Sequence, residues 1–161
     1  FAQVVNFYGE KLYWQIRKMV LDHDDANDLL QNTFLKAWMN IDYFRGEAKL
    51  STWLYKIAIN ECITFLNRQR MQNNVSIDDT DVFLLERLKG DEYFDGDAAQ
   101  MKLQKAILTL PEKQRAVFNM KYFDDMKYED MSEIFGTSVG ALKASYHHAV
   151  KKVEEFLTKD I

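Results

Sequence analysis

The chain has 161 residues, of which 47% are hydrophobic and 29% charged, and its formal net charge is −4. No uninterrupted apolar run is long enough to span a bilayer, and no signal-peptide pattern opens the sequence. The single cysteine, Cys62, excludes an internal disulfide framework and fits a reducing compartment, so we expect a cytoplasmic protein.

Acidic residues gather in the middle of the chain. Residues 71–97 carry eight acids and two bases, a local net charge of −6, whereas each flank carries +1. The span is rich in Asn, Asp and Gly, and we expect a solvated acidic linker with one short helix. The alternative is a segment that imitates nucleic acid and occupies a basic channel.

Apolar residues recur at i, i+3 and i+4 almost everywhere, and strand-like alternation is rare, so the sequence predicts an all-α fold. Two small helical domains, residues 1–70 and 98–161, flank the acidic linker. Domains of this size are marginal alone and often retain apolar surface for a partner. Helices are expected near residues 1–21, 25–41, 49–70, 98–109, 111–123, 127–135 and 139–158.

The second helix combines acids at its start with an apolar face. Asp24, Asp25 and Asp28 suit the positive end of a helix dipole. Asp28 and Gln31, three residues apart, share one polar stripe. Taken alone, these residues are capping acids and a solvated glutamine. The apolar sides are formed by Leu29, Leu30, Phe34, Leu35 and Trp38.

The third helix has two contrasting sides. Its inward stripe consists of Leu54, Ile57, Ala58, Cys62, Phe65 and Leu66. The other side carries Trp53, Lys56, Asn60, Thr64 and Asn67, followed by Arg68 and Arg70. Aromatic rings beside Lys, Arg and Asn can stack unpaired bases and hold a nucleic-acid backbone. The alternative is that a tryptophan near a helix end belongs to the core.

The second half of the chain is predicted to form a helix-turn-helix. Pro111 suits the first position of a helix that buries Val117, Phe118 and Met120. A break at Asp124–Asp125 precedes a short helix carrying Met131, Ile134 and Phe135. Gly136 supplies a left-handed position that ends this helix, and Ser138 is a good N-cap for the next one. A helix, a glycine-containing turn and a second helix make up this motif.

The last helix has one apolar stripe and one basic face. The stripe contains Val139, Leu142, Tyr146, Ala149, Val150, Val153, Phe156 and Leu157. The opposite face contains Ala141, Lys143, Ala144, Ser145, His147, His148, Lys151 and Lys152, with no acid from Val139 to Lys152. Lysines neutralise phosphates and short side chains let a helix approach base edges in the major groove. The alternative is a helical hairpin with a solvated lysine face.

Together these stretches resemble the extracytoplasmic-function group of the sigma-70 family, the smallest bacterial sigma factors, over essentially the whole chain. The resemblance rests on residues 26–38 (ANDLLQNTFLKAW), 53–60 (WLYKIAIN), 110–115 (LPEKQR), 128–131 (YEDM) and 138–143 (SVGALK). It implies a transcription initiation factor rather than an enzyme, with core RNA polymerase, promoter DNA and an anti-sigma factor as partners. It implies no cofactor, no metal and no small-molecule substrate.

The resemblance also implies roles for individual residues. The residues that it implies for docking on the largest polymerase subunit are Asp28, Gln31, Asn32 and Leu35. For the promoter −10 element, it implies that Asn60 binds a flipped base of the non-template strand. The residues implied beside it are Trp53, Lys56, Arg68 and Arg70. The residues that it implies for recognition of the −35 element are Ala141, Lys143, Ser145, His148, Lys151 and Lys152. The linker resembles the family segment that threads toward the polymerase active site and RNA-exit channel.

The chain departs from the family pattern at two places. An acid and an arginine usually follow the asparagine of the third helix, where this chain has Thr64 and Asn67. The usual arginine pair of the last helix is replaced by Ser145 and His148. We therefore expect fewer phosphate contacts than is usual, and the family's common −35 sequence need not apply.

Two other functions compete with this interpretation. One is a conventional helix-turn-helix regulator that does not dock on polymerase. The other is a helical metal hydrolase built on His23–Asp24, which would need further ligands when the remaining histidines are His147 and His148. We expect no metal site at that adjacent pair, because the side chains of neighbouring helical residues point about 100° apart. The sequence contains no Gly-rich phosphate loop and no CxxC pair.

Overall fold

The computed structural model describes residues 1–44, 46, 49–72, 88 and 97–159, and within these ranges it is all-α, as predicted. Each helix predicted outside the acidic linker is present, with ends within two residues of the expected ones. A short 3-10 helix, η1, was not predicted. The elements are α1 (Ala2–Val20), α2 (His23–Met39), η1 (Ile41–Tyr43), α3 (Leu50–Gln72), α5 (Ala98–Leu108), α6 (Glu112–Tyr122), α7 (Tyr128–Phe135) and α8 (Val139–Thr158).

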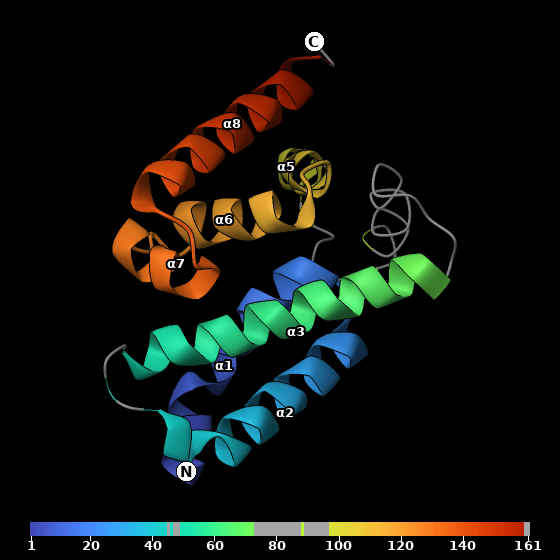
Figure 1. The fold of residues 1–161 in the computed structure, drawn as a ribbon. Helices are drawn as coiled ribbons and strands as arrows, with labels where there is room; N and C mark the ends of the chain where they lie inside the picture. The colour runs from blue at the N-terminus through green and yellow to red at the C-terminus, as the bar shows by residue number, and fades with distance from the viewer. Residues whose placement is uncertain (45, 47–48, 73–87, 89–96, 160–161) are drawn as a thin grey trace.

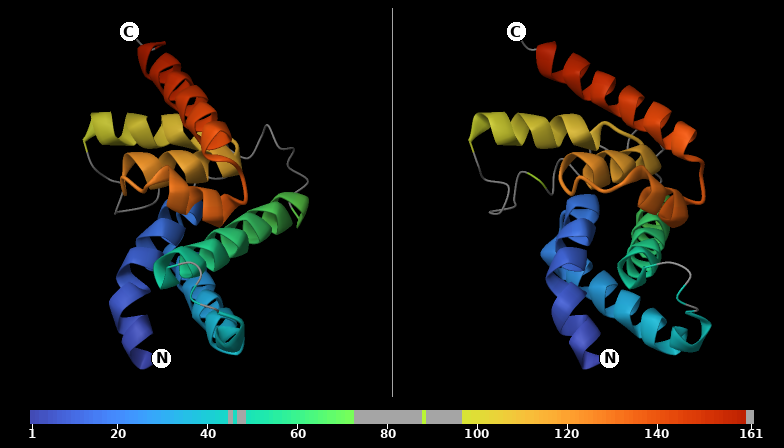
Figure 2. Two further views of the ribbon diagram at one scale, coloured as in Figure 1. Left: turned by 60° about the vertical axis from the view of Figure 1, so that its left-hand side comes forward. Right: turned by 90° about the vertical axis from the view of Figure 1, so that its left-hand side faces the viewer.

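The helices form two layers that follow the order of the chain. Figure 1 shows α1, α2 and α3 in the lower layer and α5 to α8 in the upper one, with the two termini at opposite ends of the molecule. The two further views in Figure 2 show the same separation. Helix α3 lies at the boundary, where it packs against α1 and α2 on one side and against α6 and α7 on the other.

One apolar core continues from the lower layer into the upper one. It joins buried residues such as Leu12, Ile16 and Leu54 to Met120 and Met131 of the second half. A second, smaller cluster belongs to the upper layer alone and consists of Ala106, Ile107, Leu110, Phe118, Ala149 and Val153. The two helical units of the prediction are therefore present, but they do not stand apart.

The predicted linker, residues 71–97, lies almost wholly outside the described residues. Its buried Leu88 joins the shared core. The structure thus leaves the expected linker helix, and the domain boundaries beside it, as predictions. Among the described helices, none is both long and apolar enough to cross a membrane.

Local chemistry explains where the functional helices begin and end. Ser138 caps α8, because its hydroxyl accepts the Ala141 N–H at 3.1 Å, as predicted. Gly136 ends α7 with φ 67°, the left-handed conformation for which glycine was expected there. The predicted break after α6 is confirmed by Asp125, whose φ is 46°.

The prediction that Pro111 is the first helical residue is wrong by one position. Pro111 has φ −56° and ψ 154°, so it is the N-cap of α6, and Glu112 begins the helix. The proline ring fixes φ but leaves ψ open to an extended value. A second cap was missed: the Asp22 carboxylate accepts the Asp25 N–H at 3.0 Å and starts α2.

Candidate nucleic-acid interface

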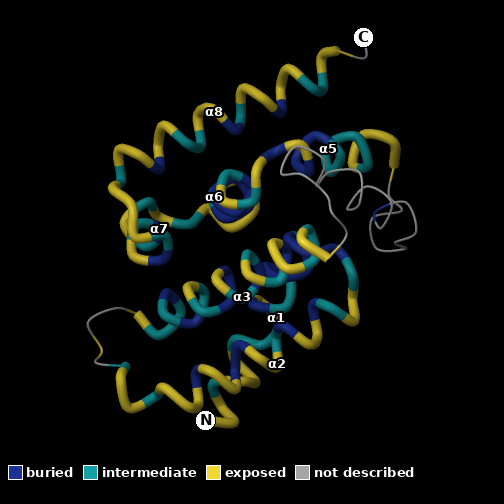
Figure 3. Tube along the Cα trace, turned by 45° about the vertical axis from the view of Figure 1, so that its right-hand side comes forward, coloured by how far each residue is buried: buried dark blue, intermediate teal, exposed yellow. Residues whose placement is uncertain are grey.

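Helix α8 buries its apolar stripe and exposes its basic face. Leu142, Ala149 and Val153 are buried, and the other five residues of the predicted stripe are partly buried. In Figure 3 the inner side of α8 faces the helices below it and its outer side is exposed. Most of the predicted DNA-reading side is therefore open to solvent. Its exposed members are Ala141, Lys143, Ala144, His147, His148, Lys151 and Lys152, and Ser145 is partly buried.

The two flanks of this face contact neighbouring helices. On one flank, Gln114 of α6 donates from Nε2 to the Ser145 carbonyl at 3.5 Å, and Lys152 donates to Gln114 Oε1 at 3.3 Å. On the other flank, the Lys143 ammonium lies 5.8 Å from the centroid of the Tyr128 ring. These contacts connect the flanks of the basic face to α6 and α7.

Helix α3 carries the second group of candidate residues. Lys56, Asn60 and Arg68 are exposed. Trp53 is partly buried, because its ring lies beside the Phe44 ring with the centroids 5.1 Å apart. Trp53 therefore fits both interpretations of its sequence position, because it packs against the core and is still partly exposed.

Arg70 does not share the exposed side of α3. It follows Asn60 by ten residues, which places it about 80° around the helix. Its guanidinium forms an ion pair with Glu112 at the start of α6 and donates to Asn67 Oδ1 at 3.3 Å. The side chains of Arg70 and Glu112 are only 11% and 10% exposed. Sequence patterns within one helix could not reveal this partner.

The outer side of α2 carries the predicted docking residues. Asp28, Gln31, Asn32 and Leu35 are all exposed. Two further apolar side chains extend this surface and were not predicted as part of it: Trp38 is 57% exposed and Met39 69%, beside Leu35 at 57%. Their i, i+3, i+4 spacing was the available signal.

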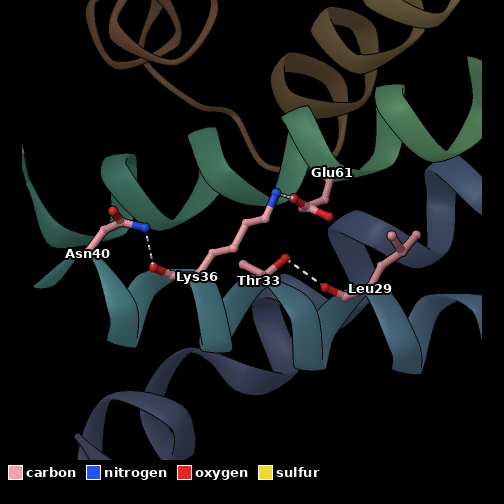
Figure 4. Close-up of polar contacts among 5 residues, drawn as sticks. All are labelled: Leu29, Thr33, Lys36, Asn40 and Glu61. Atoms are coloured by element: carbon pink, nitrogen blue, oxygen red, sulfur yellow. Dashed lines mark hydrogen bonds and ion pairs between the residues drawn. The ribbon is translucent and has the colours of Figure 1, made fainter.

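Figure 4 shows polar contacts within α2 and between α2 and α3. Lys36 reaches from α2 to an ion pair with Glu61 of α3, which ties the two helices together. Thr33 donates its hydroxyl to the Leu29 carbonyl at 2.7 Å, and Asn40 donates to the Lys36 carbonyl at 2.8 Å. The predicted docking residues of α2 take no part in these contacts.

Several polar contacts join the two layers besides the Arg70–Glu112 pair. Gln15 of α1 donates to the Asp124 carboxylate, and the Lys18 ammonium lies 4.3 Å from the centroid of the Phe123 ring. Although Asp124 is exposed as a residue, partial burial of its carboxyl group raises its pKa above the ordinary value, and Lys18 and the Gln15 hydrogen bond oppose the rise.

The histidines of the hydrolase alternative do not come together. His23 lies at the start of α2, where its Nδ1 is 2.6 Å from the Tyr13 hydroxyl. His147 and His148 lie on α8, in the other layer. Among the residues that the structure describes, no three His, Cys, Asp or Glu side chains are grouped so that they could hold a metal ion.

Known proteins resemble the chain along both layers. Residues 4–71 match the family Sigma-70 region 2, and residues 100–153 match Sigma-70, region 4. The ECF RNA polymerase sigma factor SigW of Bacillus subtilis is 30% identical over 155 residues, which cover 91% of this chain and 83% of that protein. The sigma-H factor of Pseudomonas aeruginosa is 27% identical over 165 residues, covering 98% and 86%.

Solved structures share the fold. The sigma factor RpoE from Bartonella quintana, in complex with the anti-sigma factor NepR, matches with a TM-score of 0.74 at 23% identity, over 100% of this chain and 98% of that one. CnrH, in complex with the cytosolic domain of CnrY, matches with a TM-score of 0.70 at 21% identity, over 100% and 89%. The chain belongs to the extracytoplasmic-function group of the sigma-70 family of RNA polymerase sigma factors.

Proposed function

We propose that this chain directs core RNA polymerase to a particular set of promoters and assists in opening the DNA strands there. Membership of the family makes it a transcription initiation factor and not an enzyme. The observation that supports this role most strongly is the exposed basic face of α8, where no acid occurs between Val139 and Lys152.

In this proposal α2 holds the polymerase. Asp28, Gln31, Asn32 and Leu35 form the contact, and the exposed Trp38 and Met39 enlarge its apolar part. Exposed apolar side chains gathered on one helix face are typical of a surface that binds another protein. A regulator that acts without polymerase would have no need of this face.

Helix α3 captures one strand of the −10 element. Asn60 grips an extruded base, Trp53 offers an aromatic edge beside it, and Lys56 and Arg68 contact phosphates. Extruding a base costs a few kcal/mol, and binding the unstacked base offsets that cost. Arg70 belongs to the same set of phosphate contacts once its present partner leaves.

Helix α8 reads the −35 element in the major groove. Ala141, Ser145 and His148 face the bases, and Lys143, Lys151 and Lys152 contact phosphates on either side. Because serine and histidine stand where the family usually has arginines, electrostatic attraction to DNA is weaker here. We expect the protein alone to bind promoter DNA weakly and to bind firmly as a complex with polymerase.

The proposed partners place the protein in the cytoplasm, where promoters lie. An anti-sigma factor is the expected inhibitor, since the RpoE structure with the same fold contains one. Such a partner would hold both layers of the chain.

The first test is transcription from genomic fragments with purified core enzyme. We expect initiation at a defined set of start sites only when this protein is added, and aligned start sites would then reveal both promoter elements. No promoter-dependent initiation from any fragment would overturn the proposal.

The second test concerns docking. We expect Asp28→Ala and Gln31→Ala to lose co-purification with core polymerase, whereas Asp42→Ala, an exposed acid in η1, retains it. If both docking variants still bind polymerase, the assignment of α2 is wrong. If the unaltered chain binds promoter DNA specifically and never polymerase, the conventional regulator is the better description.

A further inference from the structure

Helix α6 turns a stripe of polar residues toward the lower layer. Glu112, Arg115 and Asn119 are spaced at i, i+3 and i+7, so they share one side of the helix. Arg115 is 0% exposed, Asn119 is 3% exposed and the Glu112 side chain is 10% exposed. We call these three residues the α6 stripe.

Each member of the α6 stripe contacts the first half of the chain. Glu112 forms the ion pair with Arg70 at the end of α3. Arg115 donates from Nη2 to the Met19 carbonyl at 3.5 Å, in the last turn of α1, where a cation complements the helix dipole. Asn119 donates from Nδ2 toward the Met19 sulfur at 3.9 Å.

The polar character of this buried stripe is informative. A face that stayed buried would be at least as stable with apolar side chains, because taking charges out of water is costly. Although the seam also contains part of the shared apolar core, these polar groups can be hydrated when the layers separate, as in interfaces between units that move relative to one another. A surface cleft of about 570 Å³, lined by Trp14, Tyr55 and Asp124 among others, also lies where the two layers meet.

The Arg70–Glu112 pair imitates a contact with nucleic acid. Arginine binds carboxylate and phosphate with the same planar fork of N–H donors. With its side chain 11% exposed and its guanidinium on Glu112, Arg70 is closed to a DNA backbone in this arrangement. Asn60 and Lys56 on the same helix remain exposed, so the effect is selective.

We propose that Glu112 stands in for a DNA phosphate on Arg70, so that the closed chain masks part of its own strand-capture surface. When the two layers separate, Arg70 releases the Glu112 carboxylate and becomes free to bind a DNA phosphate. Closure of the layers and DNA binding at Arg70 therefore exclude each other. This inference rests on the proposed role of α3 in binding the promoter strand. A change that weakens closure and leaves Arg70 intact should therefore strengthen DNA capture, by at most the factor by which it increases the open fraction.

The first arm of the test measures closure without DNA or polymerase. Dyes on Glu10→Cys, an exposed residue of α1 that lines the cleft, and on Lys127→Cys, an exposed residue beside the lining residue Met126, report the separation of the layers by energy transfer. We expect Glu112→Gln and Arg70→Gln each to lower the transfer efficiency. The charge-swapped double variant Glu112→Arg/Arg70→Glu should restore it, because it rebuilds the pair. Glu154→Gln, a matched exposed acid on α8, should leave it unchanged.

An unchanged energy-transfer efficiency in both single variants would overturn the proposal. A double variant whose transfer efficiency is as low as that of the single variants would overturn it as well. Helical content and melting temperature of each variant show that an opened chain is still folded. If Glu112→Gln unfolds the upper layer, Arg70→Gln tests the same pair from the other side.

The second arm measures masking. At limiting protein and core enzyme, we expect Glu112→Gln to raise promoter-dependent transcription several-fold, and Arg70→Gln to lower it despite being open. Equal transcription by Glu112→Gln and the unaltered chain would overturn masking. If the unaltered chain supports no transcription at all, the proposed function fails, while the energy-transfer arm still decides whether the pair holds the layers together.

Discussion

Helices α3 and α8 both carry predicted DNA contacts, yet the fold treats them differently. Helix α3 packs against helices of both layers, and one of its candidate residues, Arg70, is already engaged by Glu112. Helix α8 packs mainly against α5, α6 and α7, and the centre of its basic face is exposed. Similar side chains on two helices thus differ in their availability to DNA.

The difference shows that availability is a property of the tertiary structure. Each helix presents lysine, asparagine or serine side chains at helical spacing, and each pattern alone suggests a nucleic-acid surface. The two helices differ because α3 packs between both layers and has its Arg70 paired with Glu112 of α6. The following predictions are ways to sharpen the contrast between a central α3 and a peripheral α8.

The largest expected contrast is in thiol reactivity. Cys62 on α3 is completely buried, and burial raises the pKa of its thiol, so the reactive thiolate is scarce in the folded chain. A cysteine introduced by Ala144→Cys on the exposed face of α8 lacks this protection. We expect a thiol reagent at neutral pH to modify the α8 cysteine at least about a thousandfold faster. Comparable rates, read by mass spectrometry, would contradict the central position of α3.

A second contrast lies in the energy of core packing. Leu54 of α3 is 0% exposed, so Leu54→Ala should lower the free energy of unfolding by about 2–5 kcal/mol. Leu157 near the end of α8 is only partly buried, and Leu157→Ala should cost clearly less. Denaturant unfolding measures both variants. An equal loss would mean that the two helices contribute alike to the core.

The third prediction concerns the electrostatics of α8. Lys151→Ala in the complex with core polymerase should reduce the slope of log affinity against log salt by about 1, because one phosphate contact is lost. Lys159→Ala, an exposed lysine beyond the end of α8, is the matched control and should leave the slope as it is. If the salt-dependence slope is the same for the unaltered chain and both variants, Lys151 does not contact a DNA phosphate.

The smallest expected effect is the pH dependence contributed by Asp124. Its pKa is raised in the folded chain, so its neutral form is favoured there, and its contribution to stability is greatest at low pH and is lost as the pH rises through the folded pKa. Relative to Asp124→Asn, the unaltered chain should therefore gain a little stability as the pH falls from 7 toward 4. Thermal unfolding across this range tests the sign, and a relative loss on acidification would contradict it.

Much of this fold was accessible from the sequence because it is encoded locally. The apolar stripe of α8, the Gly136 turn and the Ser138 cap each depend on a few neighbouring residues, and all were predicted correctly. Pro111 was misplaced by one position because proline suits both the N-cap and the first turn. Asp22 was overlooked as a cap among four acids that stand close together.

The candidate site was less accessible, because its state depends on residues far apart in the chain. The exposed basic side of α8 follows from helical periodicity alone. The pairing of Arg70 with Glu112, the Gln15–Asp124 hydrogen bond and the burial of Arg115 join positions that no local pattern relates. The division into two units was likewise predicted, whereas the apolar core that they share was not.

The position of α3 between the layers also bears on how the chain assembles. Contacts within the first layer join neighbouring helices, which favours rapid formation, whereas those across the seam must wait for residues far along the chain. During synthesis the amino-terminal layer leaves the ribosome first, so we expect α3 to pack against α1 and α2 before α6 and α7 are available. Helices α6 and α7 would then pack against the other side of an α3 that is already in place.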